Sequence, residues 1–324
     1  MTNRRFFSRW QNVLGFVIVA VYFGIALAAP RLAPGSPRIS VEITKANNFG
    51  NVPLPPSSAL PLGSISTGIL GEQLNVFNVV VNGTRSALVF GLTVALVTAA
   101  FGVLIGVTAA YLGGWVNNLI MRITDAFLAF PAIVGVVLFE QLLSIARQMS
   151  GSQIIVINGL VQQTGTPSPM QHFFERFDPV LVALILFSWM PYARIMNAVI
   201  LYAKEADYVQ AARALGAGGG RILFRHLIPN TISPAVVLLA RDIGGMVVMQ
   251  ATLTFIGLGG QSTWGGLLAT GRRWIIGPGG NPLTYWWVFV PATLALVFFG
   301  IGWNLLGDGL NDWLNPRVAE QIRI

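Results

Sequence analysis

Residues 204–230 read KEADYVQAARALGAGGGRILFRHLIPN, and they form the one strongly polar internal segment of a chain of 324 residues. Apolar runs lie on both sides of this segment. Of all residues, 54% are hydrophobic and only 10% are charged, and the mean hydropathy is +0.67. Because soluble domains carry about a quarter charged residues, this composition indicates a polytopic membrane protein.

Six segments are long and apolar enough to cross a bilayer as helices, which takes about 20 residues. They are residues 13–29, 86–110, 126–148, 179–202, 232–257 and 285–306. The first segment follows three arginines and also fits a cleavable signal peptide, but its apolar run is long for one, so we expect it to be retained. The predicted fold class is an all-α membrane protein with six transmembrane helices.

The distribution of Lys and Arg predicts the orientation of these spans. Basic residues are a little more than twice as dense in one set of segments, 1–12, 111–125, 203–230 and 308–324, as in the alternate set, 30–85, 149–178 and 258–284. Since basic residues favour the cytoplasmic side, we expect both termini and the loop 203–230 in the cytoplasm. Residues 30–85 are then external, and the Pro-, Ser- and Gly-rich stretch from 30 to about 70 is expected to form no further span. The core of five spans covers residues 86–307.

The polar loop predicts two short helices joined by a turn. Its first half is rich in Ala and Leu, and acidic Glu205 and Asp207 stand in the opening turn, which favours a helix. One face at i, i+3, i+4, i+7 spacing carries Tyr208, Ala211, Ala212 and Leu215. Gly216 suits the end of that helix, and a second helix over 221–228 is expected to stop at Pro229. Residue physics alone leaves two interpretations open: a bracket that a partner grips, or an amphipathic hairpin on the membrane surface.

The spacing within the loop resembles a known family. QAA, three residues, Gly, nine residues and HLIP is similar to the EAA signature of permease subunits of binding-protein-dependent ABC importers, in which EAA-xxx-G is followed after nine residues by I-x-L-P. Gln210 stands at the Glu position and His226 at the Ile position. The residues that match the pattern are Ala211, Ala212, Gly216 and Pro229.

Three further stretches resemble the dipeptide, oligopeptide and nickel group of these permeases. They are YLGGWVNNLIMRITDAFLAFP at 111–131, LTFIGLGG followed by STWGGLL within 253–268, and NLLGDGLNDWLNPR at 304–317. The last is similar to the C-terminal signature of the C-type subunit of a heterodimer. The resemblance covers residues 84–317 well. The external stretch 30–82 has no counterpart in it, and Gln250 stands where the group often has Glu.

The resemblance implies a type I ABC importer permease in the bacterial or archaeal cytoplasmic (inner) membrane. It implies as partners a paralogous B-type permease, two ATP-binding subunits that hold ATP and Mg²⁺, and an extracytoplasmic solute-binding protein. Peptides are the first choice of substrate, and nickel chelates, sugars and other polar solutes stay open. The residues expected to couple the loop to the ATPase are Asp207, Tyr208, Gln210, Ala211, Ala212, Arg213, Gly216, Arg225, His226 and Pro229.

Several polar residues fall inside the predicted spans, where charge is costly and usually faces a bundle interior or water. Candidates for a translocation path are Glu140, Arg241, Asp242, Gln250 and Thr254. A structural pairing is an equal alternative for the three charged members. For Arg194 we favour a structural role. Arg122 and Asp125 lie three residues apart, which predicts that they pair on one helix face.

The absence of certain motifs from the sequence limits the mechanisms that the chain could use. There is no GxxxxGK[ST] phosphate loop, so we expect no ATPase site and no catalytic residues in this chain. Cysteine is absent and the two histidines, His172 and His226, lie far apart in the sequence, so neither a metal site nor a cofactor is expected. The basic residues are scattered between apolar runs, which argues against nucleic acid. The rival classes are an ion-coupled secondary transporter, which would show inverted repeats, and a membrane scaffold or channel subunit.

Overall fold

The computed structural model describes residues 9–40, 51–69, 71–149, 153–157, 160–164, 178–275 and 283–314. The chain forms two compact units. Unit 1 comprises residues 1–95, 236–257 and 261–324, and unit 2 comprises residues 96–235 and 258–260. Residues 1–8 and 315–324 of the predicted cytoplasmic ends, the latter including the last residues of the NLLGDGLNDWLNPR stretch, lie outside the described residues, as does the segment that contains His172.

Among the described residues, five helical stretches are long and apolar enough to cross a membrane. They are α2 (Trp10–Leu32), α3 (Val76–Leu112), α7 and α8 together (Pro179–Ser188 and Met190–Ala203), α12 (Ser233–Ile256) and α14 (Val290–Leu314). A sixth span exists if the bent pair α4 (Gly114–Ala129) and α5 (Ala132–Met149) crosses as one unit. Five of the six predicted spans are therefore confirmed as helices. That the first is retained rather than cleaved stays a prediction.

The third predicted span differs from the expectation of one continuous helix over 126–148. The structure ends α4 at Ala129, begins α5 at Ala132 and bends the chain by 84° between them. Pro131 lies at the bend, and the residue before it, Phe130, is extended with φ −84° and ψ 127°. A proline disfavours the helical conformation at the preceding residue and donates no backbone hydrogen bond, so Pro131 accounts for the break.

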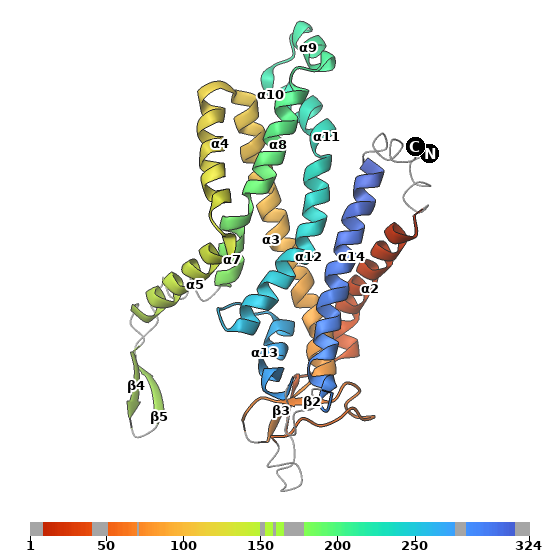
Figure 1. Ribbon diagram of the computed structural model, residues 1–324, viewed down its shortest axis with the longest axis vertical. Helices are drawn as coiled ribbons and strands as arrows, with labels where there is room; N and C mark the ends of the chain where they lie inside the picture. Colours follow the sequence, from red (N-terminus) through yellow and green to blue (C-terminus); the bar gives the residue numbers. More distant parts are fainter. Residues whose placement is uncertain are drawn as a thin grey trace. The chain divides into compact units, whose positions relative to one another are not determined.

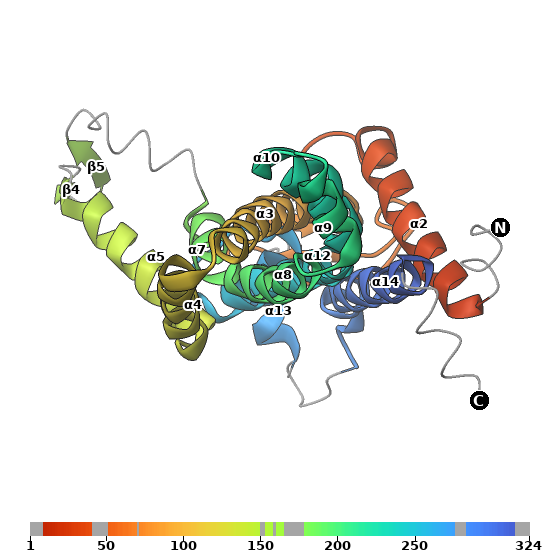
Figure 2. The same cartoon turned by 90° about the horizontal axis from the view of Figure 1, so that it is seen from above.

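In unit 1, α2 lies alongside α14, as both views show (Figures 1 and 2). Two glycines allow this close approach. A Cβ on Gly15 would lie 2.7 Å from the Leu306 nitrogen, and one on Gly302 would lie 2.5 Å from the Ile18 side chain. Helices pack tightly in membranes through such small residues. The Tyr22 hydroxyl adds a hydrogen bond of 2.6 Å from α2 to the Ala295 carbonyl of α14.

The predicted external stretch folds into a small sheet in unit 1. Strands β1 (Arg38–Ser40), β2 (Ser64–Ser66) and β3 (Glu72–Asn75) pair antiparallel in the order β1-β3-β2. Its buried Ile65 packs with residues of α13 (Thr263–Ile275) and of the 3-10 helix η2 (Trp286–Val288). Between Leu32 and Val76 the described residues contain no membrane-spanning helix, as expected for the stretch to about residue 70. Residues 76–85, also predicted to be external, instead form the start of α3.

In unit 2, the C-terminal half of α3 packs closely on α8. A Cβ on Gly102 or on Gly106 would collide with the backbone carbonyls of Trp189 and Ala193. The Asn197 amide of α8 donates to the Asn117 side chain of α4 at 2.5 Å and to the Gly106 carbonyl at 3.4 Å. After α5 comes a hairpin of β4 (Gln153–Ile157) and β5 (Leu160–Thr164). Backbone-to-backbone contact and amide hydrogen bonds thus hold this bundle together.

We predict that Gly83→Ala destabilises the protein, whereas Gly24→Ala does not. A Cβ on Gly83 would collide with the ring of Trp264, which is 1% exposed and donates to the Val80 carbonyl at 3.0 Å. Overpacking of this kind costs roughly 1–3 kcal/mol. A Cβ on Gly24 meets nothing within 4 Å, so the control gains only the higher helix propensity of alanine. Equal melting temperatures of the two variants in detergent would contradict this packing.

Candidate functional site

The polar loop of unit 2 follows α8 and lies past its end (Figure 1). It consists of α9 (Asp207–Ala214), α10 (Gly219–Arg221), the π-helix η1 (Ile222–Leu227) and α11 (Ile228–Thr231). Asp207 stands in the first turn of α9, as predicted, and its carboxylate suits the positive end of the helix. Glu205 lies before the helix, because the chain turns at Lys204 and does not become helical until Asp207.

Gly216 ends α9 in a Schellman motif. Its φ is +80°, the Gly216 N–H donates to the Arg213 carbonyl at 2.9 Å, and the Ala217 N–H donates to the Ala212 carbonyl at 3.0 Å. These two bonds satisfy carbonyls that the end of a helix leaves free. The prediction that the first helix ends at Gly216 is confirmed.

The second half of the loop differs from the predicted helix over 221–228. The helix begins at Gly219, where a Cβ would collide with the Tyr111 hydroxyl at the end of α3. The expected stop at Pro229 is wrong, since helical structure continues through it to Thr231. Pro229 lies in the first turn of α11, where its missing N–H costs little. The turn before it is the π-helix η1, a rare form that is frequent at functional sites.

The loop buries three apolar side chains and exposes two others. Val209 of α9 and Leu227 of η1 are fully buried, and Ile222 is nearly so. On the outside, Leu215 is 89% exposed and Phe224 is 66% exposed. Two apolar side chains of this mostly polar loop are thus open to its surroundings.

The structure gathers the ten predicted coupling residues on this one loop. Eight of them are exposed: Asp207, Tyr208, Gln210, Ala211, Arg213, Gly216, Arg225 and Pro229. Ala212 and His226 are half-buried, so the four-residue face predicted for α9 is not uniformly outward. Phe224 was not among the predicted residues. The feature of the sequence that could have indicated Phe224 is an aromatic side chain within a mostly polar loop.

Ion pairs account for two of the charged residues in the predicted spans. Arg241 of α12 pairs with Asp308 of α14, and Arg194 of α8 pairs with Asp125 of α4. The predicted pairing of Arg122 with Asp125 is therefore wrong. The i, i+3 rule considers only one helix, whereas packing brings α8 beside α4 and supplies a closer cation.

The uncharged path candidates on α12 are held by local bonds. The Thr254 hydroxyl donates to the Gln250 carbonyl at 2.9 Å and accepts the Ser262 N–H at 3.3 Å. Gln250 is 5% exposed. Asp242 is half-buried and is engaged with another group of the chain, as is Gln250. The Thr254 hydroxyl thus links the last turn of α12 to the Ser262 backbone after it.

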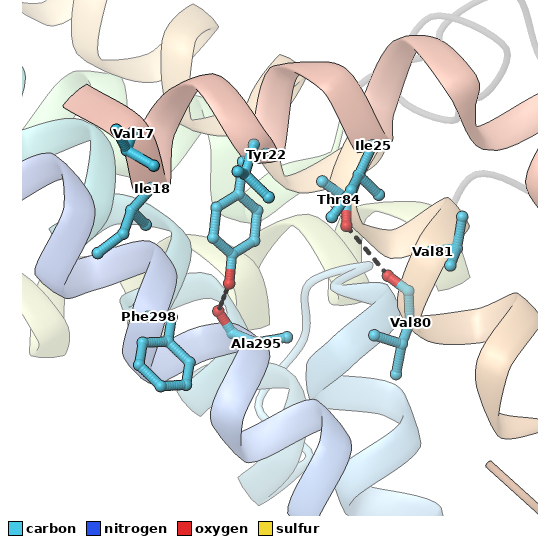
Figure 3. A pocket seen from close by; sticks show the side chains of 10 residues that line it. Val17, Ile18, Tyr22, Ile25, Val80, Val81, Thr84, Ala295 and Phe298 are labelled. Atoms are coloured by element: carbon cyan, nitrogen blue, oxygen red, sulfur yellow. Dashed lines mark hydrogen bonds between the residues drawn. The ribbon is translucent and has the colours of Figure 1, made fainter. Parts of the chain in front are cut away.

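A groove of unit 1 lies between α2, α3 and α14 (Figure 3). Its volume is about 320 Å³, and its walls are almost wholly apolar. The two hydroxyls in its lining are both bonded, Tyr22 to the Ala295 carbonyl and Thr84 to the Val80 carbonyl. The groove therefore offers no free polar group to a polar solute. Among the described residues, no group of three His, Asp or Glu side chains could hold a metal ion.

Comparison with known proteins adds an independent observation. A sequence model described as "Binding-protein-dependent transport system inner membrane component" matches residues 102–320. A glutathione transport system permease protein of Pectobacterium atrosepticum is 32% identical over 98% of this chain and 90% of its own length. Its counterpart in Escherichia coli is 30% identical over 97% and 89%. A dipeptide transport system permease protein of Alkalihalophilus pseudofirmus is 28% identical over 95% and 86%.

We predict that Arg241→Glu lowers stability and that Asp308→Lys, added to it, restores most of the loss. The single variant places two carboxylates side by side on α12 and α14, and the double variant reverses the pair. Both side chains are about half exposed, so we expect a coupling energy of about 1 kcal/mol. Melting temperatures of wild type, both single variants and the double variant give that energy. Strictly additive effects would mean that the pair contributes nothing.

Proposed function

The chain belongs to the family of binding-protein-dependent transport system inner membrane components, and on that premise we propose that it forms half of a peptide-conducting pathway. Members of this family are permease subunits of ABC importers, with ATPase activity in separate subunits. The predicted all-α, multi-pass inner-membrane permease is thereby confirmed. The rival classes, an ion-coupled transporter and a non-transport scaffold, are set aside by this membership.

Peptides are the substrate that the relatives support. The similar permeases are named for dipeptide and glutathione transport, and the match to them spans nearly the whole chain. We propose the same substrate class for this chain, with an extracytoplasmic solute-binding protein as the donor. The test is uptake of a labelled dipeptide into proteoliposomes that hold the complete complex. An absence of uptake with ATP and binding protein present would contradict peptide transport.

The other half of the pathway is assigned to a paralogous B-type permease. The C-terminal stretch at 304–317, which is similar to the C-type signature, supports a heterodimer. Two ATP-binding subunits would hold ATP and Mg²⁺, so that this chain needs no cofactor of its own. We propose that both termini and the polar loop lie in the cytoplasm, which the distribution of basic residues supports.

The single observation that carries the coupling role is the exposure of two apolar side chains on the polar loop. Leu215 and Phe224 are exposed to solvent. The side chains of Val209, Ile222 and Leu227 in the same loop are buried. A rigid bracket with an uncovered apolar surface suits docking into a cleft of an ATPase. Closure of the ATPase dimer on ATP would then move the bracket and switch the access of the pathway, a two-state rigid-body change.

We predict that Gly216→Val abolishes substrate-stimulated ATP hydrolysis by the complex, whereas Gly218→Val largely preserves it. Neither glycine has a neighbour within 4 Å of a Cβ, so neither variant causes a clash. Only Gly216 has a positive φ, +80°, which a β-branched residue adopts with strain. Gly218 has φ −65° and ψ 154°, which valine tolerates. Both variants should insert into the membrane, and unimpaired stimulation in the Gly216 variant would exclude the loop as the coupling element.

A further inference from the structure

Glu140 differs from the other charged residues of the predicted spans. Arg194 and Arg241 each have an aspartate partner, and Asp242 is engaged with another group of the chain. Among the residues that the structure describes, the Glu140 carboxylate forms neither a hydrogen bond nor an ion pair. Glu140 lies on α5, the second helix of the bent pair that forms one span only if both helices cross together. Ionisable residues of membrane spans usually face the bundle interior or water, and they mark substrate pathways.

The side chain of Glu140 lies on the packed face of α5. One helical turn earlier on the same face, Val136 is fully buried, and a Cβ on Gly135 would lie 2.8 Å from the Phe187 ring of α7. The opposite side of α5 carries exposed residues such as Leu138 and Leu142. Glu140 itself is half-buried. Its carboxylate therefore lies on the side of α5 that packs against the rest of unit 2.

Gly259 provides the space that the carboxylate occupies. A Cβ at this position would lie 2.7 Å from the Glu140 carboxyl carbon and 2.8 Å from its Oε1, closer than van der Waals contact permits. The φ of Gly259 is +102°, a conformation that other residues adopt only with strain. Two independent features of glycine, the absent side chain and the permitted φ, thus keep the carboxylate in its place.

We propose that Glu140 is a binding site in the translocation path for the α-ammonium group of the peptide. This inference rests on the proposed function. A carboxylate with no cationic partner in the described part of the chain pairs best with a cation that the substrate supplies. The α-ammonium is the cationic group that every unmodified peptide carries, whatever its side chains. A site for it would therefore serve peptides of different sequence.

The test compares a labelled dipeptide with the same dipeptide acetylated at its amino terminus. The complete complex, with partner permease, ATP-binding subunits and solute-binding protein, is reconstituted in proteoliposomes, and uptake of both compounds is measured. We expect Glu140→Gln to lower uptake of the free dipeptide about tenfold, the effect of losing one hydrogen bond to a charged group. Uptake of the acetylated dipeptide should change little. Because the same binding protein serves every variant, any change in the ratio belongs to this chain.

A pair of glycine variants separates a role for the carboxylate from a general effect of strain. Gly259→Ala should reproduce the loss of selectivity, because the methyl group displaces the carboxylate. Gly257→Ala is the matched control. Its φ of +79° also disfavours alanine, but a Cβ there meets nothing within 4 Å. This variant should keep the wild-type ratio of the two uptake rates, even if both rates fall.

The outcomes distinguish the inference from the function on which it rests. A wild-type complex that imports neither dipeptide contradicts peptide transport itself. A wild-type complex that imports the free dipeptide, while Glu140→Gln keeps the same ratio of free to acetylated uptake, overturns only the role of Glu140. An equal fall of both rates in the Glu140→Gln variant would likewise assign the side chain to structure and overturn the proposal.

Discussion

The hydrocarbon core of a bilayer contains no water, and this one constraint governs most of what the chain does with its polar groups. Backbone N–H and C=O groups must bond within the protein, so the spans are helices. Charged side chains must find partners or leave the membrane. Arg241 and Arg194 each pair across helices with an aspartate, Asp308 and Asp125, that belongs to a predicted cytoplasmic segment. The Glu140 carboxylate has no such partner among the described residues, and it lies beside Gly259, just past the end of α12.

The same constraint removes the force that packs helices in water, since lipid tails are as apolar as leucine side chains. Close contact must replace it. Glycines at 15 and 302 in unit 1 and at 102 and 106 in unit 2 bring backbone near to backbone or side chain. Amide and hydroxyl groups add directed bonds, such as Asn197 to Asn117 and Tyr22 to the Ala295 carbonyl. The high glycine content, 36 residues, therefore reflects packing as well as turns.

The sequence predicts what depends on local composition and fails where distant segments meet. Hydropathy located the spans, and a glycine after an Ala-rich helix located the Schellman motif at Gly216. The break at Pro131 was overlooked because a count of apolar residues takes no account of backbone conformation. The partner of Asp125 could not be found from helix spacing, since Arg194 approaches it only after α4 and α8 have packed. The stop at Pro229 failed for a related reason, because the π-helix before it was not foreseeable from propensities.

The position of the polar loop between two spans explains how force on it could reach the pathway. Only Lys204, Glu205 and Ala206 separate the end of α8 from α9, and only Ile232 separates α11 from α12. Ile232 itself has helical angles, φ −69° and ψ −19°, so the chain from η1 into α12 is nearly continuous helix. A flexible linker at either junction would change its own conformation when the loop is displaced, and it would not transmit the displacement to the helices. With short junctions on both sides and a closed core at Val209 and Leu227, a displacement of the loop must instead move or rotate α8 and α12.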